Sequence, residues 1–124
     1  MHAITTSYEI LGGRATALVL LTTEKFRAAN PKTTQAVMAA LTEAIDRINA
    51  DKPAAAALYK EMTGDKTPTE EIHAMMADPG FAYTLTPEKV FKTVQFQQHI
   101  GSIKTAPQSW KELFFPEAHT LQGD

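Results

Sequence analysis

The sequence of 124 residues contains no cysteine. Disulfide bonds, thiolate metal ligands and cysteine nucleophiles are therefore excluded. It also lacks a long apolar run: a run such as residues 17–21 is far too short to cross a bilayer. The opening residues "MHAITTSYEI" do not have the basic and then apolar layout of a signal peptide.

A large excess of either charge is missing as well. The formal net charge is -2, and a protein that binds a nucleic-acid backbone usually carries a basic face, so no nucleic acid partner is expected. Hydrophobic residues make up 44% and charged residues 21% of the chain, which is typical of a soluble globular protein. The length suits one compact domain.

One apolar segment stands out near the start of the chain. Residues 15–23, "ATALVLLTT", follow Gly12-Gly13 and are rich in leucine and β-branched residues. A short continuous apolar run predicts a strand that is buried on both faces. A second short strand is predicted over 81–85, "FAYTL". A buried strand needs neighbours on both sides, and the sequence offers few of them, which favours a larger protein of which this chain is the end.

The rest of the chain is predicted to be helical, over 24–29, 31–49, 52–63, 68–77, 87–100 and 109–114. Three pairs place a capping residue before a proline, which suits the first helical position: Asn30-Pro31, Thr67-Pro68 and Thr86-Pro87. The capping-box spacing occurs twice, in Thr67 with Glu70 and in Ser109 with Glu112.

Further expectations concern packing and helix ends. The apolar face of the 31–49 helix is predicted to be buried through Val37, Leu41, Ile45 and Ile48. Gly64 and Gly101 are predicted to end helices. Trp110, Phe114 and Phe115 are predicted to form the packing face of a terminal helix. The tail "AHTLQGD" is predicted to be frayed.

No set of residues is arranged as catalysis requires. Glu70 and His73 have the spacing of a helical metal pair, but such a site needs a second motif and further glutamates. Gly12-Gly13 fits neither common phosphate-loop layout, and no serine stands in a nucleophile elbow. We therefore predict no enzyme, no metal and no cofactor.

An ordered series of segments covers nearly the whole chain: "SYEILGG", "EKFRAANPKT", "AAAALYKEMTGD", "TPTEEIHAMMADPGFAYTLTPEKVFKTVQF" and "HIGSIKTAPQSWKELFFPE". The series resembles the C-terminal portion of substrate-binding proteins of the nitrate/sulfonate/taurine class of ABC transporters. The shared features include Phe26 shortly before Asn30-Pro31, the turn Gly101-Ser102-Ile103, and the late "SWKELF" segment.

The resemblance implies the helix-rich C-terminal part of an α/β, type II periplasmic-binding-protein fold, with one or two strands and five to six helices. Residues 1–124 would be a single partial domain, in which 1–23 cross between two lobes and 24–124 clad one lobe. It further implies a small anionic or sulfonate- or nitrate-like solute held between the lobes, an ABC permease as partner, and a periplasmic or other extracytoplasmic location.

Solute contacts are predicted around the glycine pair. Hydroxyl groups stand just before it, backbone amides are expected to be free at it, and a planar guanidinium that suits a sulfonate or carboxylate follows it. The predicted ligand-binding residues are Thr5, Thr6, Ser7, Tyr8, Gly12, Gly13 and Arg14. Arg14 is equally well explained as a surface charge, and relatives often carry an uncharged residue at this place.

Two other interpretations stay open. An enzyme on the same lobed scaffold, which makes the pyrimidine precursor of thiamine, would need clustered histidines and an iron site, whereas the four histidines here are scattered. The chain could instead be a free-standing helical interaction module, a dimer that pairs residues 15–23 across a two-fold axis.

Overall fold

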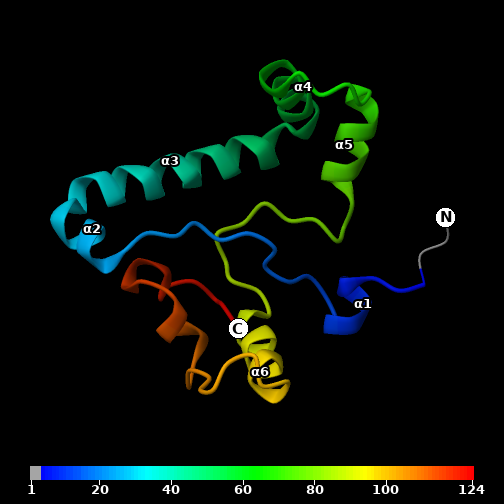
Figure 1. The fold of residues 1–124 in the computed structure, drawn as a ribbon. Coiled ribbons are helices and arrows are strands. Elements are labelled where there is room, and N and C mark those ends of the chain that lie inside the picture. The colour runs from blue at the N-terminus through cyan, green and yellow to red at the C-terminus, as the bar shows by residue number, and fades with distance from the viewer. Residues whose placement is uncertain (1–3) are drawn as a thin grey trace. The chain divides into compact units, whose positions relative to one another are not determined.

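A computed structural model describes residues 4–124, which fold into helices joined by loops and turns (Figure 1). Tertiary contacts divide the chain into two compact units. The first unit is the described part of Met1–Val19 together with Thr84–Asp124, and the second unit is Leu20–Tyr83. The expectation of a single partial domain, with a crossing segment over 1–23 and cladding over 24–124, stays a prediction.

The predicted α/β fold is wrong, because residues 4–124 contain no β-strand, neither at 15–23 nor at 81–85. A strand exists only where a second extended segment completes a hydrogen-bonded ladder. Thr16 donates its N–H to the Glu88 carbonyl at 2.8 Å, but no backbone hydrogen bond joins residues 17–22 to any other described residue. In the other predicted strand, the Phe81 N–H donates to the Asp78 carbonyl and closes a turn. The apolar character of a segment is therefore not enough to make it a strand, because it does not provide a second segment to pair with.

The second unit contains four successive helices: α2 (Glu24–Ala29), α3 (Pro31–Ala50), α4 (Lys52–Thr63) and α5 (Thr69–Ala77). Their bounds lie close to the predicted ones because local signals define them. The hydroxyl of Thr23 accepts from the Phe26 N–H at 3.0 Å at the start of α2. Gly64, with a φ of 68°, ends α4 in the left-handed region, as predicted.

Two predicted caps fail in this unit. Asn30 precedes α3, but its side chain makes no capping hydrogen bond and donates instead to the Phe26 carbonyl at 3.0 Å. The α5 helix begins at Thr69 with Pro68 at its N-cap, and no side chain caps it, so the expected Thr67–Glu70 capping box does not form. The Thr67 N–H instead donates to the Asp65 carboxylate at 2.8 Å. That bond belongs to the turn that precedes α5.

The core of the second unit is small. Ala56 of α4 and Ile72 and Met76 of α5 are buried, and Ile48, Ala55 and Tyr83 pack against them. The expectation for the long helix is therefore wrong: α3 has no buried residue, and Val37 is 41% exposed. Only the Ile48 end of its apolar stripe reaches the core, because α4 and α5 turn back against each other rather than along α3.

The first unit contains α1 (Ser7–Leu11), α6 (Val90–His99) and two short 3-10 helices, η1 (Trp110–Leu113) and η2 (Pro116–Ala118). The sequence interpretation missed α1. It also started α6 too early: Lys89, with a φ of 57°, holds the left-handed conformation just before the helix, so Thr86-Pro87 does not begin it. Gly101 follows α6 with a φ of 77°, as expected of a helix end.

Residues 118–124 were predicted to fray, but they fold back onto the rest of the first unit, to which they belong (Figure 1). Trp110 is buried and contacts the rings of Phe114 and His119 edge-on, at centroid distances of 5.8 and 6.2 Å. Gly123 lies against the indole, and the Val90 N–H donates to the Asp124 carbonyl at 3.1 Å. The expected packing role of Trp110 is confirmed, and the tail is part of that packing.

No helix within residues 4–124 is long and apolar enough to cross a membrane.

Candidate functional site

The glycine pair forms a tight elbow directly after α1. Gly12 has a φ of 74° and Gly13 a φ of 141°, both in the region that residues with a Cβ avoid. The Gly13 N–H donates to the Tyr8 carbonyl at 2.8 Å, and the Gly12 N–H donates to the Glu9 carbonyl at 3.3 Å. Both amides therefore close the end of α1, and neither is the free donor that the sequence interpretation expected at this point.

The predicted hydroxyl contacts lie on and just before α1. Thr6 is the N-cap: its hydroxyl accepts from the Glu9 N–H at 3.2 Å, and its own N–H donates to the Glu9 carboxylate at 2.9 Å. The Thr5 hydroxyl donates to the same carboxylate at 2.9 Å. Ser7 is the first residue of α1, and the exposed Tyr8 follows it. The hydroxyls of Thr5 and Thr6 thus serve the helix cap.

The capping interactions change the acidity of Glu9. The N–H of Thr6 and then the hydroxyl of Thr5 hydrogen-bond to the charged form of the Glu9 carboxylate and lower its pKa below the ordinary value of 4.5. The spacing Thr6-x-x-Glu9 is that of a capping box, so this signal was present in the sequence and was missed.

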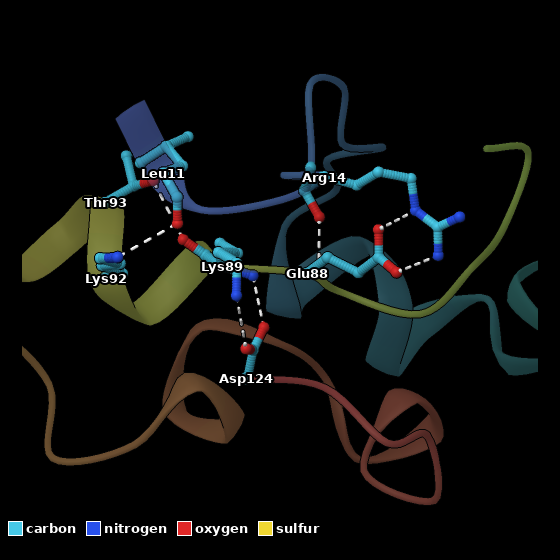
Figure 2. Close-up of polar contacts among 8 residues, drawn as sticks. Leu11, Arg14, Glu88, Lys89, Lys92, Thr93 and Asp124 are labelled. Atoms are coloured by element: carbon cyan, nitrogen blue, oxygen red, sulfur yellow. Dashed lines mark hydrogen bonds and ion pairs between the residues drawn. The ribbon is translucent and has the colours of Figure 1, made fainter. Parts of the chain in front are cut away.

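Arg14 holds a carboxylate in the two-pronged geometry expected for an anion ligand (Figure 2). Its Nη2 lies 2.9 Å from Glu88 Oε1, and its Nε lies 3.2 Å from Glu88 Oε2. The Arg14 side chain is 43% exposed and that of Glu88 28% exposed. The hydrogen bonds and the charge of Glu88 raise the pKa of Arg14, which therefore stays fully charged.

The backbone fixes this pair in place. Thr16, two residues after Arg14, donates its N–H to the Glu88 carbonyl, and its hydroxyl accepts from the Glu88 N–H at 2.9 Å. Glu88 is therefore held through its main chain and its side chain by the segment that follows the glycine elbow. No local signal in the chain marks this partner, because Arg14 and Glu88 lie 74 residues apart.

Further charges lie at the start of α6 (Figure 2). The Asp124 carboxylate accepts from the Lys89 N–H and lies 3.6 Å from the Lys89 Nζ. The Lys92 Nζ donates to the Leu11 carbonyl at 3.1 Å, which ties α6 to the end of α1. We call Arg14, Glu88, Lys89, Lys92 and Asp124 the elbow cluster; its three basic and two acidic side chains leave one positive charge in excess.

Two other parts of the molecule are weaker candidates for a functional site. Glu70 and His73 both lie on α5, and no group of three His, Asp or Glu side chains within the described residues is placed to hold a metal ion. A shallow depression along α3 is lined by Ala39, Thr42, Glu43, Asp46, Arg47 and Ala50. All of these residues belong to one helix, so the depression is an open surface and not an enclosed site.

Comparison of this chain with models of known protein families, with curated proteins and with solved structures finds no match.

Proposed function

We propose that this chain forms part of the solute-binding component of an ABC importer, takes a small anionic solute such as a sulfonate or nitrate, and does no chemistry. The ordered series of segments from "SYEILGG" to "SWKELFFPE" supports the proposal. The proposal implies a permease as partner and an extracytoplasmic location. It does not depend on a β-sheet within residues 4–124.

The observation that carries the proposal is the forked contact of Arg14 with Glu88, directly after the glycine elbow. The Glu88 carboxylate occupies the position and orientation that a carboxylate or sulfonate of a solute would take on a guanidinium. Binding is then an exchange of one anion for another. Tyr8, whose side chain is exposed on α1, offers a hydroxyl from the same stretch of chain.

Titration calorimetry of the full chain with taurine, nitrate and a neutral analogue tests the proposal. We expect weak binding of the two charge-bearing probes, because Glu88 competes for Arg14. Glu88→Gln removes that competing charge and should tighten binding, whereas Arg14→Ala should abolish it. Arg47→Ala is the matched control, since Arg47 pairs with Glu43 at 2.7 Å on the surface of α3.

Two results would contradict the solute-binding role. One is equal heats for wild type and Arg14→Ala, and the other is equal affinity for the neutral analogue. Circular dichroism of each variant separates a lost contact from a lost fold. A third result concerns only the competition by Glu88. Micromolar affinity of the wild-type chain for taurine or nitrate would contradict that competition, but not the solute-binding role.

A second candidate function is that of a helical interaction module. It is favoured by the exposed apolar segment 17–21, in which Leu18 is 91% and Leu21 83% exposed. Monomeric proteins rarely leave such runs open to water. This candidate predicts that the chain associates with another polypeptide and gives no solute-dependent signal in the titrations.

A further inference from the structure

We propose that residues 16–22 pair with the same residues of a second copy of this chain, antiparallel and around a two-fold axis at Val19. This inference goes beyond the solute-binding proposal and does not depend on it. The exposure of the segment, its unused backbone groups and the symmetry of its residues favour a second copy of this chain as the partner.

The segment is open to association. Leu18, Val19, Leu20 and Leu21 are 91%, 54%, 69% and 83% exposed, and all residues from 17 to 23 are exposed. Their backbone groups make no hydrogen bond to the rest of the described chain over 17–22. An uncharged, apolar segment with free N–H and C=O groups is a template for a pairing strand.

The sequence of the segment complements itself about Val19. In an antiparallel pair centred there, Leu18 faces the partner's Leu20, Ala17 faces the partner's Leu21, and Thr16 faces the partner's Thr22. Apolar residues therefore meet apolar residues, and threonine meets threonine, which are favourable cross-strand pairs. By the two-fold symmetry, each of these contacts occurs twice.

The flanking charges favour the same arrangement. Arg14 and Glu24 flank the paired residues, so Arg14 comes near the partner's Glu24, the first residue of α2. Glu88 occupies only Nε and Nη2 of the guanidinium, which leaves Nη1 for that contact. A parallel pair in the same register would place Arg14 beside the partner's Arg14, and like charges directly opposite each other are destabilising. Charge complementarity thus selects a second copy in the antiparallel direction.

The bonds of Thr16 determine which edge is free. Along an extended chain, alternate residues direct their N–H and C=O groups to the same edge. Thr16 uses its N–H on Glu88. In the extended pairing proposed here, the even-numbered residues therefore share that edge, and the odd-numbered residues 17, 19 and 21 offer their groups to a partner. A two-fold axis at Val19 then makes Val19 and the partner's Val19 a hydrogen-bonded pair. The register from side-chain matching is therefore one that the free edge allows.

Cysteine pairing tests the register directly, because the chain has no cysteine of its own. Leu18 and the partner's Leu20 form a non-hydrogen-bonded pair, with Cα atoms about 4.5 Å apart, a spacing that a disulfide accepts. Leu18→Cys mixed with Leu20→Cys should give a disulfide-linked heterodimer under mild oxidation. Either variant alone should give far less product, because each cysteine then faces leucine. Met62→Cys, 77% exposed on α4, is the control for random collision.

Sedimentation over a concentration series gives the oligomeric state. A short paired segment buries less than the roughly 800 Å² per partner of a standard interface, so we expect a weak, reversible dimer. Leu20→Lys disturbs two symmetric cross-strand pairs, each of up to about 1 kcal/mol, and should weaken the dimer about tenfold. Wild type that stays monomeric throughout, or Leu18→Cys that cross-links alone as well as in the mixture, would overturn the proposal. Either result leaves the solute titrations unaffected.

Discussion

Gly123 lies so close to the indole of Trp110 that a Cβ at this position would be 2.9 Å from Cε2 and 3.0 Å from Cζ2. Only the absence of a side chain allows the tail to cover the ring. The contact explains why a polar, glycine-containing tail is ordered against the first unit, although its composition resembles that of a frayed end.

Gly123→Ala should therefore displace the tail from Trp110. Overpacking of this kind typically costs about 1–3 kcal/mol. The single tryptophan is the reporter: its fluorescence should shift to longer wavelength as the indole gains water. Gly101→Ala is the control, because nothing lies within 4 Å of a Cβ there while its φ of 77° still strains the backbone. An unchanged emission spectrum in Gly123→Ala would show that the tail does not cover the ring.

Because the core of the second unit is small, replacing either of two neighbouring methionines by alanine should lower the free energy of unfolding by unequal amounts. Met76 is 8% exposed in that core, and Met75 is 56% exposed. Met76→Ala should cost about 2–5 kcal/mol because it leaves a cavity, and Met75→Ala should cost far less. Urea unfolding followed by helical circular dichroism measures both. Equal loss of stability would mean that α4 and α5 do not pack through Met76.

The stabilisation of α1 by its capping box should depend on pH through the protonation of Glu9. Its pKa in the folded chain is below the ordinary value of 4.5, so the stabilisation is present in full above that pH and is lost as the pH falls through the lowered pKa. The Thr6 amide proton should report this transition in NMR spectra. Thr5→Val removes one hydrogen bond and should raise the midpoint, and Glu9→Gln should abolish the transition. A midpoint above 4.5 in wild type would contradict the capping geometry.

Asp124 should stabilise the start of α6, because its carboxylate and carbonyl accept from the amides of Lys89 and Val90. Asp124→Ala removes the side-chain acceptor of the Lys89 N–H and should cost about 1 kcal/mol, a typical net contribution of one hydrogen bond. Asp124→Asn keeps an acceptor and should cost less. Hydrogen exchange at the Lys89 amide measures the local effect. Unchanged protection of that amide in Asp124→Ala would rule out a stabilising hydrogen bond from the Lys89 N–H to Asp124.

Local signals in the sequence located most of the helices of the second unit. The extents of α2 and α4 follow from a threonine cap and a left-handed glycine, both of which act within one turn of the chain. The same reasoning failed for α6, since Lys89 adopts a left-handed conformation next to Asp124, which is 35 residues away. The partner of Arg14 could not be predicted for the same reason, because nothing near Arg14 in the sequence marks Glu88.

The sequence by itself determined where the chain can turn and where it can be helical, because caps, prolines and glycines act on adjacent backbone groups. It also determined that residues 15–23 are apolar. Only the tertiary structure decided that this segment has no ladder, since a strand is a property of two segments and the described residues supply one contact, at Thr16. Likewise, only the fold of the first unit brought the Glu88 carboxylate to Arg14 and the last residues to Trp110.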